Sequence, residues 1–154
     1  MDAAPALIDY GRIADTVRAL RGLRDAFNEI WGRATNVPLI DDLRWDRIRA
    51  VHVKLLLGNL VLMQARLTDL GVFARVATDC LGVDDRLRDR LDAVVGEVCW
   101  LLGEHSDLMV GLSSPNLTCD QIGDLYGELD VPQMDTRLDG LCARAERIVA
   151  EVSA

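Results

Sequence analysis

Only two histidines, His52 and His105, are available in this 154-residue chain for acid–base chemistry near neutral pH. His105 lies in the segment 103–107, where Glu104 and Asp107 are the nearest carboxylates. These three side chains could share a divalent cation, but no Glu-x-x-His pair of the di-iron bundle type accompanies them. A polar helix terminus is the simpler interpretation, and we assign no metal ligand, no cofactor and no catalytic residue.

Arg47 precedes His52 by five residues within a segment that we expect to be helical. This Arg-x4-His spacing resembles the signature of the HEPN ribonucleases, which are small helical proteins that dimerise. The resemblance implies a ribonuclease that uses Arg47 and His52, and we keep it as an alternative function. On a regular helix the two side chains point about 140° apart, so they converge only if the helix deforms.

The sequence carries no Gly-x-Ser-x-Gly turn, no Walker-type loop and no Rossmann glycine pattern. Its four cysteines, Cys80, Cys99, Cys119 and Cys142, include no C-x-x-C pair that would indicate a zinc site. The last three fall within or beside apolar helical patterns, where a free thiol behaves as a small hydrophobe. We therefore expect buried, reduced thiols and a reducing compartment.

The charged residues comprise 16 arginines and one lysine, Lys54, with 19 aspartates and six glutamates. The formal net charge of −8 favours solubility and opposes nucleic-acid binding, which usually requires a clustered basic face. The first residues lack the basic segment and apolar run of a secretory signal. The longest charge-free apolar stretch, from Leu55 to Ala65, is too short to span a bilayer. We expect a cytoplasmic protein without membrane insertion.

Apolar residues recur at three- and four-residue steps along most of the chain, and no segment alternates as a half-buried strand would. The pattern predicts one all-α domain over residues 1–154, a helical bundle of about five helices with a long antiparallel hairpin at its N-terminus. The third helix is expected to fray near Gly103, with a further turn over 107–111. The five predicted helices cover residues 7–34, 43–78, 84–103, 118–129 and 131–152.

The second of these helices is apolar on nearly all sides between Leu55 and Met63. A helix of this kind is usually buried, which predicts that it forms the centre of the bundle. An apolar stripe near Leu7, Ile8 and Tyr10 is expected to remain uncovered. Exposed stripes of this kind mark contacts with a partner or with a second copy of the chain.

Three tryptophans lie near the ends of predicted helices. Aromatic side chains at such positions usually close a core, and they are also common anchors of protein contacts. The candidate interaction residues are Tyr10, Trp31, Trp45, Trp100, Tyr126 and Asp130.

Residues 7–84 resemble the helical hairpin of the WXG-type proteins exported by actinobacterial type VII secretion systems. The shared features are a long helix, a turn, Trp45 at the start of a second long helix, and an acidic end at residues 84–85. A Tyr-x-x-x-Asp sequence of the kind that signals export runs from Tyr126 to Asp130. The resemblance implies a leaderless, secretion-associated protein whose long apolar faces pair with a partner.

A second resemblance is to the BH-motif regulators of apoptosis, including their poxviral relatives. Residues 20–27 resemble a BH3 segment, residues 45–50 the core of BH1, and residues 100–103 BH2, in the expected order. This resemblance implies an inhibitor of apoptosis or innate signalling whose groove accepts a partner's helix. Our principal expectation is a non-catalytic helical protein that acts through contacts with a protein partner or as a homodimer.

Overall fold

The computed structural model describes residues 10–35, 43–80, 82–115 and 117–153. Within them the chain is helical, without strands, and the prediction of an all-α bundle of five helices is confirmed. The first expected helix was to begin at residue 7, which lies outside the described residues. The helices are α1 (Tyr10–Thr35), α2 (Leu43–Thr78), α3 (Asp85–Leu112), α4 (Cys119–Glu128) and α5 (Val131–Val152).

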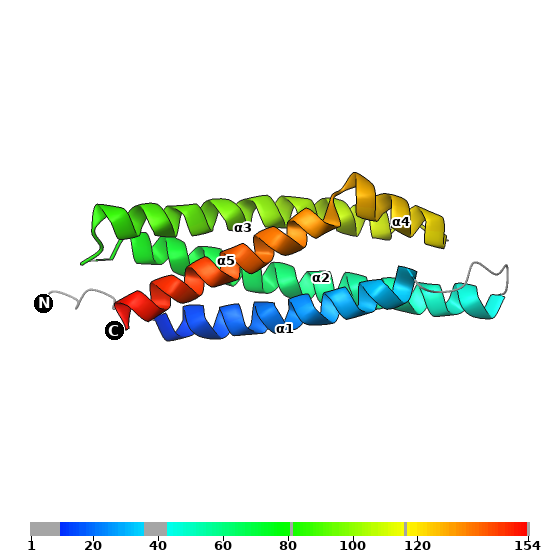
Figure 1. Ribbon diagram of the computed structural model, residues 1–154, viewed down its shortest axis with the longest axis horizontal. Helices are drawn as coiled ribbons and strands as arrows, with labels where there is room; N and C mark the ends of the chain where they lie inside the picture. The colour runs from blue at the N-terminus through cyan, green and yellow to red at the C-terminus, as the bar shows by residue number, and fades with distance from the viewer. Residues whose placement is uncertain (1–9, 36–42, 81, 116, 154) are drawn as a thin grey trace, which may run out of the picture.

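The four long helices form an elongated bundle in which successive helices run in opposite directions (Figure 1). Helix α2 packs against α1 and α3, and α5 packs against the same two helices from the other side. The short α4 lies near one end of the bundle, where it contacts α1, α3 and α5. Because its main neighbours are α1 and α3, α2 retains a free outer face.

Local signals set several helix boundaries, close to the bounds predicted from the sequence. Asp84 caps α3 by accepting a backbone hydrogen bond, and Thr118 with Gln121 forms the capping box of α4. Gly82 adopts a left-handed conformation, with φ of +85°, in the turn after α2. Pro132 lies in the first turn of α5, where its missing N–H removes no helical hydrogen bond.

The predicted end of the third helix near Gly103 is wrong, because α3 continues to Leu112. The additional turns bury His105, Leu108 and Leu112. A glycine inside a helix costs about 1 kcal/mol relative to alanine, whereas each buried leucine contributes about 2 kcal/mol. Burial therefore outweighs the local preference at this position.

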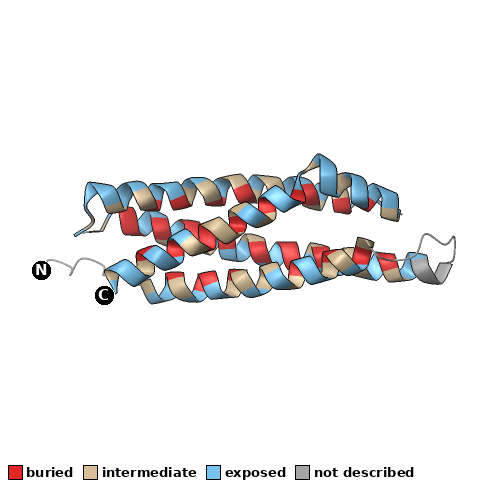
Figure 2. Ribbon diagram, viewed as in Figure 1, coloured by how far each residue is buried: buried red, intermediate tan, exposed pale blue. Residues whose placement is uncertain are grey.

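The core is built from apolar stripes that all five helices turn inward, as Figure 2 shows by the inward position of the buried residues. The contribution of α2 follows alternating steps of four and three residues, which places it on one face of the helix. The largest fully buried side chains of α2 are Leu56, Leu60, Met63, Leu67 and Leu70.

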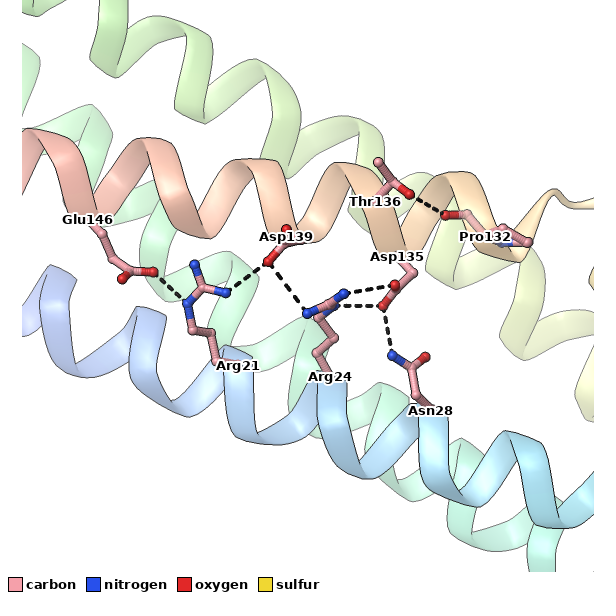
Figure 3. Close-up of polar contacts among 8 residues, drawn as sticks. All are labelled: Arg21, Arg24, Asn28, Pro132, Asp135, Thr136, Asp139 and Glu146. Atoms are coloured by element: carbon pink, nitrogen blue, oxygen red, sulfur yellow. Dashed lines mark hydrogen bonds and ion pairs between the residues drawn. The ribbon is translucent and has the colours of Figure 1, made fainter.

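Ion pairs join α1 to α5 along their exposed boundary (Figure 3). Arg24 donates two hydrogen bonds to Asp135, with N–O distances of 2.7 and 2.9 Å, and Asn28 donates a third at 3.0 Å. Arg21 bridges Asp139 and Glu146, which lie about one and three turns beyond Asp135 on α5. Hydrogen bonding to Arg24 lowers the pKa of Asp135, which is consistent with a well-formed pair.

Replacing Arg24 by alanine is expected to lower the free energy of unfolding by about 1 kcal/mol, because a partly buried bidentate pair is lost. Arg18→Ala is the matched control on the same helix, since among the described residues Arg18 pairs with its exposed neighbour Asp15 alone. We expect the control to change the free energy by less than about 0.5 kcal/mol. Urea denaturation measures both variants, and an equal loss would contradict a stabilising role for the α1–α5 pairs.

Candidate interaction surface

The outer face of α2 carries a second apolar stripe, turned away from α1 and α3. Its positions again follow alternating steps of four and three residues, the heptad spacing of helices that pair with another helix. Val51, Leu55, Leu62, Val72 and Val76 are each between 50% and 57% exposed. We define the α2 seam as Val51, Leu55, Gly58, Leu62, Ala65, Asp69, Val72 and Val76.

The prediction that α2 forms the centre of the bundle does not hold for this outer face, which is exposed. Helix α2 has two heptad stripes on opposite sides, and the residues that the structure describes cover only one of them. The uncovered stripe that we expected near Leu7, Ile8 and Tyr10 is not found at Tyr10, which is half-buried against the core. Leu7 and Ile8 lie outside the described residues.

Charged side chains of both signs lie in and beside the α2 seam, and Arg66 and Arg75 accompany the two aspartates of its C-terminal half. Arg47 and Lys54 lie close to its N-terminal half, and Asp69 and Asp79 lie in or beside its C-terminal half. Asp69 has a contact of 3.9 Å to Arg66. Among the described residues, Arg47, Lys54 and Asp79 form no ion pair within the chain. The seam therefore presents charges available to a partner.

Two of the predicted interaction residues, Trp31 and Tyr126, meet at the end of the bundle that carries α4. Their ring centroids are 5.5 Å apart, with Trp31 buried and Tyr126 39% exposed. They line an open hollow of about 590 Å³ together with Asn28 and Asp135. The Asp135 carboxylate is already bound by Arg24 and Asn28, so it serves to join α1 and α5.

Trp100 also has a partner within the bundle. The Arg137 guanidinium lies 3.4 Å from the centroid of its ring and forms an ion pair with Glu97. This arrangement covers the boundary between α3 and α5. Asp130, at a φ of +48°, caps α5 by accepting a hydrogen bond from the backbone of Gln133. Trp100 and Asp130 therefore have structural roles in this fold.

Trp45 lies in the first turn of α2, and its side chain is outside the described part of the structure. Arg47 and His52 follow on the same regular helix, with Arg47 exposed and His52 half-buried. The helix shows no interruption between them that would bring the two side chains together.

The prediction that His105 belongs to a polar helix terminus is wrong. His105 is 3% exposed in the middle of α3, and its Nδ1 atom has no hydrogen-bond partner. Burial lowers the pKa of His105 to about 4, so the imidazole is neutral at pH 7. No group of three residues in the described part of the chain is arranged to hold a metal ion.

The four cysteines are free thiols with different exposures. Cys142 is buried, which raises its pKa to about 11, and Cys80 and Cys119 are half-buried. The expectation that Cys99 is buried is wrong, because Cys99 lies on the exposed side of α3. Its apolar sequence neighbours lie on another side of that helix.

By length and composition, the segment Asp46–Thr78 of α2 would suffice to cross a membrane. Core helices of soluble proteins meet the same criterion, so it carries little weight by itself.

Comparison with protein families, curated proteins and solved structures finds no match for this chain. The resemblances to the WXG-type, BH-motif and HEPN families thus stay predictions.

Proposed function

We propose that this protein is non-catalytic and acts by binding another protein molecule through the α2 seam. The observation that carries the proposal is the seam itself, a heptad stripe of half-exposed valines and leucines along a helix of 36 residues. Burying apolar surface contributes about 25 cal/mol per Å², so a long stripe left in water favours association. A heptad spacing matches the surface of a second helix.

The surroundings of the seam favour a protein partner over a membrane or a nucleic acid. Helix α2 is held to α1 and α3 by its buried stripe, which would be exposed if α2 left the bundle to cross a bilayer. The chain carries a formal net charge of −8, which opposes binding to anionic lipid surfaces and to phosphate backbones.

The positions of the two histidines support a non-catalytic role. His105 is enclosed in the core, where a substrate would not reach it. His52 and Arg47 lie on one regular helix, whose geometry directs their side chains apart. The α1–α2 hairpin with an unpaired apolar face also agrees with what the WXG-type resemblance implies. We therefore propose a secretion-associated role as the cellular context.

Site-specific photo-crosslinking tests the proposed function. A photoreactive residue at Leu62 is expected to form an adduct with a protein in cells, because this position lies at the middle of the α2 seam. The matched control is Val110, which is 74% exposed on α3 and lies outside the seam. Mass spectrometry identifies each adduct. Adducts with lipid alone at Leu62, or no more protein adduct there than at Val110, would overturn the proposal.

A further inference from the structure

We infer that the partner of the α2 seam is a second copy of this chain, bound with its α2 antiparallel to the first. The twofold axis crosses the interface midway along the seam, between Leu62 and Ala65. The inference rests on the proposed function and identifies the partner. Each copy contributes about 38 Å of helix, from Val51 to Val76, at a rise of 1.5 Å per residue.

The order of side-chain sizes along the α2 seam allows it to pair with itself in reverse. About the stated axis, Val51 faces the partner's Val76, and Leu55 faces the partner's Val72. Leu62 faces the partner's Ala65, so that a long side chain meets a short one. Every apolar position of the seam except Gly58 thereby packs against an apolar side chain, which is the condition for a dry helix pair.

Asp69 and Gly58 decide between the antiparallel and the parallel arrangement. A parallel pair would place Asp69 opposite the partner's Asp69, and two like charges in an apolar interface repel strongly. It would also place Gly58 opposite the partner's Gly58, leaving a gap without side chains. The antiparallel pair places Asp69 opposite the partner's Gly58, where the missing side chain leaves room for the carboxylate and its water.

Gly58 has no evident role within a single copy. A Cβ atom added at this position, as at several other helical glycines, would meet no described atom within 4 Å, although glycine inside a helix costs about 1 kcal/mol. Close approach of a second helix is a common reason for glycine on a helix face. The position of Gly58 opposite the partner's Asp69 supplies that reason.

Charge complementarity at the two ends of the seam supports the same orientation. Arg47 and Asp79 are separated by 32 residues, or about 48 Å along one chain, and are exposed. The antiparallel register places Arg47 beside the partner's Asp79, once at each end of the dimer. Lys54 lies between the partner's Asp69 and the partner's Arg75, whose opposite charges offset each other. The Arg47–Asp79 contact therefore specifies the orientation.

Sedimentation equilibrium tests whether the partner is a second copy of this chain. The wild-type chain is expected to have twice its mass of 17.0 kDa at about 100 µM and to dissociate on dilution. Leu62→Glu is expected to raise the dissociation constant at least about 100-fold, because it buries a charge at the centre of the seam. Val110→Glu, the matched control on α3, should leave the dimer intact. Circular dichroism verifies that both variants remain folded.

A charge-exchange cycle tests the orientation. Arg47→Asp and Asp79→Arg are each expected to raise the dissociation constant about 3- to 10-fold, and the double variant to return it close to the wild-type value. The two positions are too far apart to interact within one chain, so rescue requires an antiparallel partner. Additive losses without rescue would overturn the antiparallel arrangement.

Other outcomes separate this inference from the proposed function. A monomeric wild-type chain whose Leu62 position crosslinks to a different protein would overturn the homodimer and leave the proposed function standing. A dimer insensitive to Leu62→Glu would also overturn the homodimer through this seam. A monomer that floats with phosphatidylcholine–phosphatidylglycerol vesicles, and loses this property with Leu62→Glu, would overturn both proposals.

Discussion

Leu91→Asp is expected to unfold the protein at 25 °C. Leu91 is 1% exposed on the inner face of α3, within the core cluster that α2 and α5 also build. An unpaired carboxylate at this position loses its hydration and the packing of the leucine, which together cost more than about 4 kcal/mol. This cost is comparable to the whole stability of a typical domain, about 5–15 kcal/mol.

The matched control is Arg88→Asp on the same helix, three residues before Leu91. Arg88 is exposed, and its contacts are an ion pair of 3.3 Å with Asp85 and a hydrogen bond to the Thr78 carbonyl. Losing these contacts is expected to cost about 1 kcal/mol or less. Thermal unfolding followed by circular dichroism compares the two variants. Equal melting temperatures would mean that the buried face of α3 is assigned wrongly.

A loss of stability below pH 6.5 is the second large effect that we expect, and it originates in His105. The pKa of His105 is lowered from 6.5 to about 4 in the folded protein. Between these values the unfolded chain binds a proton that the folded protein does not, so lowering the pH favours unfolding. The loss reaches about 3 kcal/mol near pH 4, at 1.36 kcal/mol per pKa unit, and vanishes above pH 6.5.

His105→Leu is expected to remove this dependence on pH. The imidazole lies near Met63 and Leu108 and makes no hydrogen bond through Nδ1, so leucine suits the site. The charged pair beside it, Arg24 with Asp135, changes the stability over a different pH range. Because the pKa of Asp135 is lowered, this pair weakens only in solutions more acidic than those that protonate the unfolded chain's His105. Urea denaturation at pH 7, 5.5 and 4.5 makes the comparison. Wild-type stability that is constant across this range would contradict the prediction.

The helices and their boundaries could be predicted because they depend on residues a few positions apart. The capping box of Thr118 and Gln121 and the N-cap Asp84 are formed by hydrogen bonds across three residues. The end of α3 was missed because its cause is not local. Gly103 weakens the helix there, and only the burial of Leu108 and Leu112 against other helices explains why α3 continues.

The candidate interaction residues were chosen by residue type, and residue type alone did not identify the exposed apolar surface. Tryptophan and tyrosine often anchor partners, but Trp31 is buried beneath Tyr126, and Trp100 is covered by Arg137. Apart from Asp69, the α2 seam consists of smaller apolar residues, and the sequence analysis missed it. A heptad count could have found it, since α2 contains two such stripes and a single chain of this length can hardly cover both.

The sequence by itself determined that the protein is helical, where most helices begin, and that α2 is apolar on nearly all sides between Leu55 and Met63. These properties follow from backbone preferences, caps and periodicity within each segment. Only the tertiary structure decided that α1 and α3 cover one side of α2 and leave Val51, Leu55 and Leu62 in solvent. The physical reason is that the exposure of a side chain depends on neighbours that are distant along the chain. In a bundle of four long helices, each helix also keeps one side that no other helix covers.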